Sequence, residues 1–427
     1  MHPLQKSQGL QPLAFAVLAA LTPPEIERAF YDENIELIPL NEEADLVAMS
    51  VETFTAKRAY QIAEIYRKQN IPVIMGGFHP TIEPAEALEH ATSVAIGDAE
   101  AIWPQILSDF QNGILKKIYK SITVSDTIKT SFDRSIFKDK KYAPFNLVQW
   151  SRGCKFHCEF CSIKSFYQGK QISRPIDEVI EEIIELDNKP LFIVDDNIFQ
   201  NRAGFSEFLQ RIAPLKKKWG CQISLDITTH DDLMELLGKS GCIMVIVGIE
   251  SLNKDDLHQM NKICNLSISD YKSAINKFRE YGIMIYGTYI FGYDHDEGDQ
   301  FEKAVNFAKR MKFAVANFNT LYPMPGTDIY VRLKNENRLL YEKWWLDDEF
   351  YYGKAMFQPV FLSPEELEDG CFRAKRSFNS IFSIIYRMLD FKCNSRNLSN
   401  SIVHLILNLS NRKQIYMKQG KGLVNIY

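Results

Sequence analysis

Short apolar segments rich in β-branched residues alternate with amphipathic helical segments along most of this 427-residue chain. In the first 112 residues, "ADLVAMSV" and "IPVIMGG" have the composition of buried strands, and an amphipathic helical pattern separates them. Such alternation with short connections predicts a parallel, doubly wound α/β sheet that binds any ligand at the carboxyl ends of its strands. Residues 1–112 are therefore expected to form a Rossmann-type domain.

A second series of strand and helix patterns follows residues 113–143, which are polar and irregular and are expected to be a linker. Residues 144–332 contain about six strand patterns with helices between them, "CIMVIVGIES" and "YGIMIYGTYIFG" being the clearest. This pattern predicts a partial (β/α)6 barrel of the TIM type, with its active site at the carboxyl ends of the strands.

Residues 333–427 differ from the barrel region in their sequence pattern, which predicts a helical C-terminal extension. An aromatic-rich stretch is followed by "SPEEL", in which Ser363, Pro364 and Glu366 occupy the positions of a capping box. The tail from Phe391 is polar apart from "IVHLILNL", which is too short to span a bilayer. We expect this segment to be a docking helix rather than a membrane-surface helix.

Composition excludes some classes of partner and indicates a compartment. The net charge of -4 provides no general attraction to a polyanion, so nucleic-acid binding is not expected. The sequence has no apolar segment long enough for a transmembrane helix, and its start lacks the features of a signal peptide. A cytoplasmic location is predicted, where clustered cysteines more often bind metal than form disulfides.

Three cysteines lie within eight residues, at Cys154, Cys158 and Cys161, directly after a strand pattern. Zinc needs four ligands, and His157 is the local candidate for the fourth. An iron-sulfur cluster of the [4Fe-4S] type normally takes four thiolates, so three would leave one iron open to another ligand. Both interpretations of the spacing remain open at this point. The other five cysteines are scattered without pairing: Cys221, Cys242, Cys264, Cys371 and Cys393.

The cysteine spacing, its position after a strand that opens a barrel pattern, and the aromatic Phe160 before the third cysteine resemble the radical S-adenosylmethionine (SAM) superfamily. The resemblance implies that Cys154, Cys158 and Cys161 hold a [4Fe-4S] cluster, and that the amino and carboxylate groups of SAM bind the open iron. It further implies that one-electron reduction cleaves SAM to a 5′-deoxyadenosyl radical, which abstracts a substrate hydrogen.

Two acidic strand ends resemble SAM-binding segments of that superfamily. In "FIVDDNIF", Asp195, Asp196 and Asn197 stand where the family binds the SAM amino group, although the family's glycines are absent. In "SLDITTH", Ser224, Asp226, Thr228 and His230 are the candidates for the SAM ribose or carboxylate. Taken alone, each segment is also an ordinary acidic turn.

Two later strand ends resemble the part of the family that packs near the SAM adenine. "VGIES" places Gly248, whose small size permits close backbone approach, two residues before Glu250. Glu250 has the alternative of binding neighbouring backbone groups. In "LYPMPGTDIY", Tyr322 and Pro323 are expected at the barrel mouth. No residue beyond the three cysteines is assigned to the cluster, and the catalytic residues are left unknown.

The N-terminal segment resembles, almost end to end, the cobalamin-binding-type domain of class B radical SAM enzymes, and the "WW…SPEEL" region resembles the extension of hopanoid methylases. Two departures leave cobalamin open. The usual first strand is absent, so either Met1 is a mis-called start or the domain lacks that strand. The cobalt-ligating D-x-H-x-x-G signature is also absent, and His79 in "GGFHPT" is expected to have a structural loop role.

The resemblance implies an enzyme that functionalises an unactivated carbon of a small metabolite, lipid or natural-product precursor. Cobalamin-dependent C-methylation is the leading prediction, with flavodoxin or ferredoxin as the reductant protein. One alternative is cobalamin-independent oxidation, cyclisation or epimerisation with a degenerate N-terminal domain. An alternative of another class is a non-catalytic, zinc-stabilised binding protein.

Overall fold

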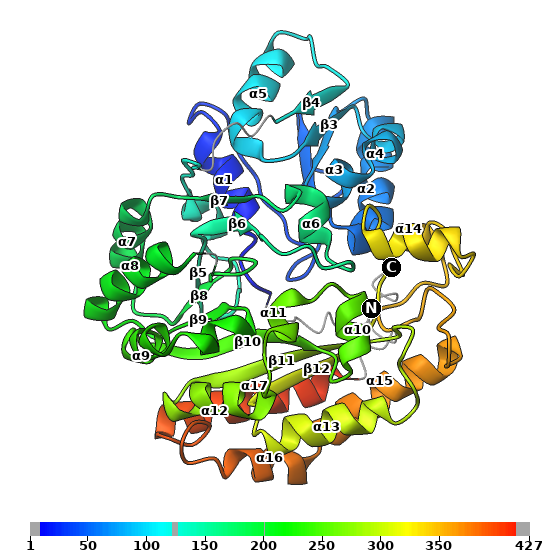
Figure 1. Ribbon diagram of the computed structural model, residues 1–427. Coiled ribbons are helices and arrows are strands. Elements are labelled where there is room, and N and C mark those ends of the chain that lie inside the picture. The colour runs from blue at the N-terminus through cyan, green and yellow to red at the C-terminus, as the bar shows by residue number, and fades with distance from the viewer. Residues whose placement is uncertain (1–8, 122–126, 200, 416–427) are drawn as a thin grey trace. The chain divides into compact units, whose positions relative to one another are not determined.

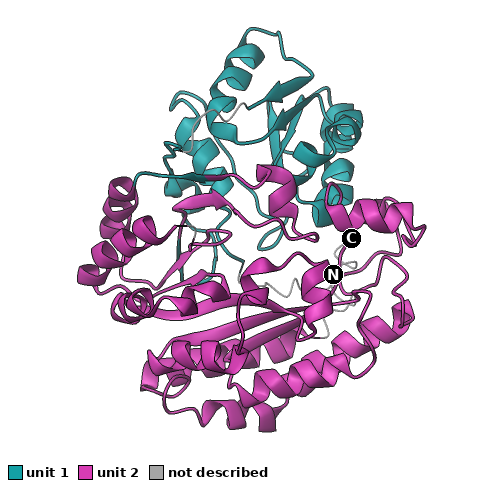
Figure 2. Cartoon of the chain, in the orientation of Figure 1, with its two compact units in different colours: residues 1–147, 172–175 teal, residues 148–171, 176–427 magenta. Residues whose placement is uncertain are grey.

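The computed structural model describes residues 9–121, 127–199 and 201–415 (Figure 1). The chain divides into two compact units: the first contains residues 1–147 and 172–175, and the second contains residues 148–171 and 176–427 (Figure 2). Both are built on parallel sheets, so the predicted α/β class is confirmed. Within the described residues, no helix combines the length and apolar character needed to cross a membrane.

The first unit is a four-stranded parallel sheet in chain order, β1-β2-β3-β4. Its buried strand β2 is apolar at every position from Val73 to Met75, as expected of a strand covered on both faces. Its strands are β1 (Val47–Ser50), β2 (Val73–Gly76), β3 (Ser93–Ile96) and β4 (Ile118–Lys120). Its helices are α1 (Leu13–Leu21), α2 (Ala56–Lys68), α3 (Phe78–Ile82), α4 (Pro84–His90) and α5 (Trp103–Gln111).

Residues 113–143, predicted to be a linker, belong to the first unit and contain β4 and the short helix η3 (Arg134–Phe137). Only Tyr119 of β4 is buried, and its hydroxyl donates to the carboxylate of Asp109 at 2.8 Å. A three-residue strand with one inward side chain has too little apolar pattern to be recognised from sequence.

His79 has the structural role that was expected, but it lies in the helix α3 rather than in a loop. Its side chain is fully buried. Nε2 lies 3.0 Å from both the Tyr60 hydroxyl and Glu86 Oε1, and Nδ1 lies 3.3 Å from the Thr53 hydroxyl. The imidazole is therefore part of a polar network inside the first unit.

The larger sheet has the strand order β12-β11-β10-β9-β8-β5, and its strands β8 to β12 belong to the second unit and pair in parallel. This sequential open sheet confirms the predicted partial (β/α)6 barrel. Its strands are β5 (Asn146–Val148), β8 (Leu191–Ile193), β9 (Trp219–Gln222), β10 (Cys242–Glu250), β11 (Met284–Phe291) and β12 (Val315–Thr320). A separate two-stranded sheet consists of β6 (Ser151–Gly153) and β7 (Gln171–Ser173).

Helices follow the strands around this sheet and share one large apolar core with it (Figure 1). Trp150 stacks on Phe208 at 5.0 Å, and Phe208 meets Trp219 edge-on, which anchors the segment that leads into the cysteine loop. The helices are α6 (Ser162–Tyr167), α7 (Ile176–Glu185), α8 (Arg202–Ile212), α9 (Asp231–Lys239), α10 (Lys254–Gln259), α11 (Ile263–Leu266), α12 (Tyr271–Glu280), α13 (Gln300–Arg310) and α14 (Asp328–Asn335).

The C-terminal extension is helical, as predicted, and comprises α15 (Pro364–Phe378), α16 (Ile381–Met388) and α17 (Leu398–Gln414). The capping box is present: the Ser363 hydroxyl accepts from the Glu366 N–H at 3.1 Å, and Glu366 Oε2 accepts from the Ser363 N–H at 2.8 Å. The helix α17 packs on the barrel through its polar side, with Asn400, His404 and Asn408 buried. Its apolar side is exposed, which the sequence pattern did not predict.

Candidate functional site

The three clustered cysteines lie in the loop between β6 and α6. Cys158 is buried, Cys154 and Cys161 are partly exposed, and all three are free thiols. Cys161 occupies the N-cap position of α6. Gly153, directly before Cys154, has φ +84°, and a Cβ atom there would lie 2.1 Å from the carbonyl oxygen of Lys170. The start of the loop therefore requires glycine.

Backbone contacts to distant segments hold the middle of this loop. The Glu159 N–H donates to the Met260 carbonyl at 2.9 Å, and the Glu159 carbonyl accepts from the Ile329 N–H at 3.3 Å. The side chain of Asn261 donates to the His157 carbonyl at 2.9 Å. The region after α10 and the start of α14 thus fix the backbone on both sides of Cys158.

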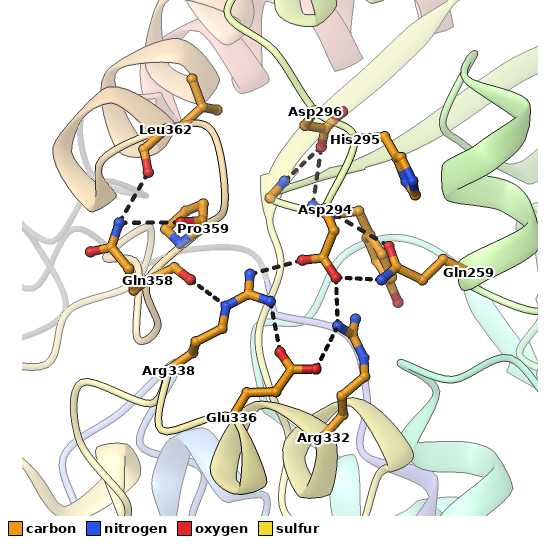
Figure 3. Close-up of polar contacts among 12 residues, drawn as sticks. Gln259, Asp294, His295, Asp296, Arg332, Glu336, Arg338, Gln358, Pro359 and Leu362 are labelled. Atoms are coloured by element: carbon orange, nitrogen blue, oxygen red, sulfur yellow. Dashed lines mark hydrogen bonds and ion pairs between the residues drawn. The ribbon is translucent and has the colours of Figure 1, made fainter.

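An ion-pair network reinforces this anchoring through α14. Arg332 Nε donates to Glu159 Oε1 at 2.7 Å, and Arg332 Nη1 donates to Asp294 Oδ2 at 2.6 Å. Asp294 also pairs with Arg338 at 2.8 Å and accepts from Gln259, so it joins two arginines and an amide (Figure 3). Burial opposes ionisation of Asp294, but its hydrogen bonds to Arg338 and Gln259 and the charges of both arginines hold its pKa below the usual value.

A buried cation lies beside the cysteines. Lys262 Nζ is 3.1 Å from Glu250 Oε1 and 5.7 Å from the ring centroid of Phe160, the aromatic residue before the third cysteine. Burial alone would lower the pKa of Lys262, but the negative charge of Glu250 beside it raises it overall. Lys262 is therefore a charged ammonium at neutral pH.

Burial raises the pKa of the Cys158 thiol to about 12, partly offset by Lys262. Burial also raises the pKa of Cys161, although hydrogen bonds from the backbone N–H groups of Lys164 and Ile163 to its sulfur partly lower it. The thiols influence one another electrostatically: Cys161 raises the pKa of Cys158, and Cys154 raises that of Cys161. Cys158 and Cys161 are therefore protonated thiols at neutral pH, and iron would deprotonate them on binding.

These residues suit a cluster better than a single ion. Among the described residues, no three His, Cys, Asp or Glu side chains converge as ligands of one metal ion, and the zinc alternative needs four such ligands. In a [4Fe-4S] cluster each thiolate binds a different iron, so the sulfurs need only surround a common volume. The exposed His157 ring packs against Gly169, so closely that a Cβ atom added to Gly169 would lie 2.3 Å from the ring. His157 therefore does not complete a set of metal ligands with the cysteines among the described residues.

The acidic strand end after β8 closes against the segment that enters the cysteine loop. Asp195 is buried, and its oxygens accept from the N–H groups of Trp150 and Ser151, each at 2.8 Å, and from the Ser151 hydroxyl at 2.6 Å. Asp196 Oδ2 accepts from the Gly153 N–H at 2.8 Å. The hydrogen bonds of Asp195 fix the start of β6, so both of its carboxylate oxygens are already occupied by protein groups. Asp196 binds the backbone of Gly153, the residue before Cys154.

Asn197 and the η5 segment (Leu225–Thr229) continue this rim of strand ends. Asn197 Nδ2 donates to the Ser224 hydroxyl at 3.0 Å, and Asn197 Oδ1 accepts from the Ser224 N–H at 3.0 Å. Asp226 Oδ1 is buried and has no hydrogen-bond partner among the described residues. Its charge helps raise the pKa of the Cys264 thiol, after burial and against Lys262. An unsatisfied carboxylate oxygen near the cysteines fits a ligand that brings a donor.

Gly248 and Glu250 end β10, and the structure shows why a glycine stands there. A Cβ atom on Gly248 would lie 2.1 Å from Glu250 Oε1 and 2.9 Å from Lys262 Nζ. Glu250 has φ +61° at a register irregularity of the strand, which turns its carboxylate toward Lys262. The close approach at Gly248 thus accommodates an ion pair of the protein itself.

Tyr322 and Pro323 follow β12 and contact the aromatic segment of the C-terminal extension. The Tyr322 hydroxyl accepts from the Gly353 N–H, and the Pro323 carbonyl accepts from Trp344 Nε1–H at 2.8 Å. The rings of Tyr322 and Trp344 lie 5.9 Å apart. These contacts tie the last strand end to the extension.

Sequence reasoning missed Lys262, Arg332 and the proximity of Cys264 to the cysteine loop. Arg332 and Glu159 are 173 positions apart in the chain. Lys262 and Cys264 lie in "MNKICNL", at the start of the short helix α11, and the composition of this segment gives no sign of a functional role. The only available signal was that this segment follows the "VGIES" strand end.

Comparison with known proteins agrees with this geometry. Residues 148–308 match the radical SAM superfamily. Over 390 residues the chain is 30% identical to a bacteriochlorophyllide d C-12(1)-methyltransferase of Chlorobaculum tepidum, covering 88% of this chain and 84% of that protein. It is 24% identical to a hopanoid C-2 methylase of Rhodopseudomonas palustris, covering 78% of this chain and 66% of that protein.

Among solved structures, the fold resembles the radical SAM methyltransferase TsrM from Kitasatospora setae with cobalamin and a [4Fe-4S] cluster bound. The TM-score is 0.56 at 14% identity, covering 79% of this chain and 72% of that one. The family match includes all three clustered cysteines, and the match to the methyltransferase of Chlorobaculum spans most of both chains. The chain belongs to the cobalamin-binding-type, class B, family of radical SAM enzymes, whose chemistry uses a [4Fe-4S] cluster and SAM.

Proposed function

We propose that this protein is a cobalamin-dependent C-methyltransferase that replaces a hydrogen on an unactivated carbon of a small, largely apolar molecule with a methyl group. The single observation that carries the proposal is the 390-residue match to a bacteriochlorophyllide methyltransferase, which extends well beyond the barrel to both flanking regions. When bound, the cluster and SAM would supply hydrogen abstraction, and cobalamin would supply the methyl group. The protein's part is to hold and orient these groups while excluding water.

We assign the cluster to Cys154, Cys158 and Cys161 and build the SAM site around it from neighbouring strand ends. Asp196 and Asn197 are the candidates for the SAM amino group. Asp226 Oδ1, buried without a partner among the described residues, is suited to accept from a ribose hydroxyl, with Ser224 beside it. The Lys262 ammonium, adjacent to the cysteines, supplies the charge that the SAM carboxylate needs.

The adenine is assigned to the rim formed by the ends of β10 and β12. Gly248 and Glu250 would line one side and Tyr322 and Pro323 the other, as the family resemblance implies. Cobalamin is assigned to the first unit, whose parallel sheet is of the type that binds ligands at strand ends. Because His79 is buried in a network with Tyr60 and Glu86, we assign it no cobalt contact.

The substrate class follows from the named relatives, which act on a bacteriochlorophyllide and a hopanoid. Both substrates are polycyclic and largely apolar, so we propose a polycyclic lipid or pigment precursor for this chain. A small reductant protein, flavodoxin or ferredoxin, would deliver the electron.

The test is an anaerobic assay of the reconstituted full chain with SAM, a strong chemical reductant and bacteriochlorophyllide d, with and without methylcobalamin. Mass spectrometry reads 5′-deoxyadenosine, S-adenosylhomocysteine and methylated product. Cys158→Ala is the test variant, and Cys371→Ala, which removes a buried thiol outside the loop, is the matched control. We expect 5′-deoxyadenosine from the wild type and Cys371→Ala but not from Cys158→Ala.

Formation of S-adenosylhomocysteine only when cobalamin is present supports methyl transfer. Formation of 5′-deoxyadenosine without S-adenosylhomocysteine under every cobalamin condition would refute methylation and leave radical oxidation, cyclisation or epimerisation. An intact cluster that yields neither nucleoside product would refute the assignment of radical chemistry to this loop.

A further inference from the structure

The C-terminal helices α16 and α17 leave a large set of apolar side chains exposed. In α17 these are Leu398, Ile402, Ile406 and Leu409, which recur about once per helical turn and so share one side of the helix. In and after α16 they include Ile381, Phe382, Ile385, Leu389 and Phe391, with Phe382 88% exposed. We call these nine residues the α16–α17 apolar face. Soluble monomers rarely leave so many neighbouring large apolar side chains uncovered without a function for them.

Specific hydrogen bonds hold α17 with its apolar side outward. The buried Arg387 of α16 donates to the carbonyls of Phe313 at 3.0 Å and Ala314 at 2.7 Å, and to Asn408 Oδ1 of α17 at 2.8 Å. Asn408 Nδ2 in turn donates to the Ala314 carbonyl at 2.9 Å. Rotation of α17 to bury its apolar side would leave Arg387 without this partner in a buried site, which is costly. The outward orientation is therefore a stable feature of the fold.

This face lies at the opposite end of the barrel strands from the SAM site. Phe313 and Ala314, which receive α16 and α17, directly precede β12. Arg396, in the turn between the two helices, donates to the carbonyl of Tyr281 at 3.0 Å, shortly before β11. The candidate SAM residues lie at or just after the carboxyl ends of their strands. The apolar face is therefore separate from the candidate SAM site. The helices α16 and α17 are coloured orange to red in Figure 1.

The charge of this segment identifies the kind of surface it fits. Residues 379–427 contain seven Lys and Arg and a single acidic residue, Asp390, in a chain whose net charge is -4. Asp390 is buried and bound by Arg279 at 2.9 Å. Lys392 and Arg396 between the helices, and Arg412 and Lys413 at the end of α17, are exposed. Apolar residues bordered by cations complement an anionic lipid surface, whereas a second copy of this segment would bring like charges together.

We propose that the α16–α17 apolar face docks on an anionic membrane surface. The two helices lie in the plane of the interface, their apolar side chains enter the boundary between headgroups and acyl chains, and the flanking cations contact the headgroups. The SAM site at the other end of the strands remains free. This inference is independent of methyl transfer, since it rests on the exposed face and its charge alone.

The test is co-sedimentation of the full chain with vesicles of phosphatidylcholine containing phosphatidylglycerol, and with vesicles of phosphatidylcholine alone. We expect binding to the anionic vesicles that weakens as salt is raised. Ile406→Asp and Phe382→Asp should each weaken binding by about tenfold or more, since each removes a buried apolar side chain from the interface. Ile184→Asp on α7 is the matched control, because Ile184 is 58% exposed and Ile406 is 61% exposed.

Equal binding by Ile406→Asp and Ile184→Asp would overturn the proposal, as would equal binding to the two kinds of vesicle. A wild-type dimer that dissociates in Ile406→Asp without any vesicle binding would assign the face to a second copy of the chain instead. Loss of binding on deletion of residues 416–427, with Ile406→Asp and Phe382→Asp binding normally, would also contradict it. Thermal melts check folding, and Phe382→Ser, which adds no charge, replaces any aspartate variant that melts below Ile184→Asp.

Discussion

Replacement of Lys262 by methionine should destabilise the second unit by removing one partner of a buried ion pair. Lys262 and Glu250 lie 3.1 Å apart, and their side chains are only 15% and 7% exposed. A buried ion that loses its partner typically costs about 3–5 kcal/mol. Glu250 keeps the hydroxyl of Thr288 at 3.4 Å, a contact worth about 1 kcal/mol at most. We therefore expect the free energy of unfolding to fall by about 3 kcal/mol.

Urea unfolding of the metal-free protein under anaerobic conditions, followed by circular dichroism, measures this loss. Lys303→Met is the control for the substitution itself, because Lys303 pairs with Asp299 at the surface and both side chains are more than half exposed. That exposed pair should contribute less than about 0.5 kcal/mol. The double variant Lys262→Met/Glu250→Gln removes both charges and should recover at least half of the loss.

If Lys262→Met costs no more than Lys303→Met, or if the double variant is as unstable as Lys262→Met alone, mutual compensation of buried charges is the wrong account of this pair. The double variant also separates folding from ligand binding. Its SAM affinity should remain low although its stability recovers, because the ammonium assigned to the SAM carboxylate is still missing.

Three further perturbations test other parts of the second unit. Burial lowers the pKa of His404 to about 4, so its contribution to stability is present above the unfolded value of about 6.5 and is lost as pH falls toward 4. Between pH 7 and pH 5 the free energy of unfolding of the wild type, measured relative to His404→Leu in urea, should therefore fall by about 2 kcal/mol, and an unchanged difference would contradict this account. Arg332→Ala should lower the amount of iron bound after reconstitution, because the Glu159 side chain loses its ion-pair partner. Arg332→Lys keeps the charge and should restore part of that iron. Equal iron content in the wild type and both variants would contradict the positioning role. Gly153→Ala should lower the free energy of unfolding by more than about 2 kcal/mol and reduce the iron content, because the new methyl group would clash with the Lys170 carbonyl oxygen at a residue with positive φ. Normal iron content in this variant would show that the loop tolerates the change.

Some predictions from sequence succeeded because the relevant residues are close together in the chain. The three cysteines fall within eight residues, so the resemblance to the radical SAM superfamily, which the family match over residues 148–308 confirms, is visible without knowing the fold. The barrel strands are long apolar runs separated by amphipathic helices, and that alternation alone implies parallel pairing. The Ser363 capping box is likewise a local pattern, and the structure forms it as predicted.

Other features depend on a single side chain or on a distant partner and left no local pattern. The strand β4 has a single inward residue, Tyr119, and its sequence pattern therefore does not predict a strand. The segment "GGFHPT" indicates a loop at His79, whereas the chain enters the helix α3 immediately after Gly77.

The sequence by itself determined the class of fold, the cysteine loop and, through its resemblance, the family, because each depends on local patterns of residues. Only the tertiary structure decided what surrounds that loop and how α17 is oriented. Arg332 reaches Glu159 across 173 positions, and Lys262 reaches Glu250 from the far side of the intervening helix α10. The helix α17 buries its asparagines because Arg387 and the Ala314 carbonyl need partners, a requirement that no periodicity of apolar residues expresses.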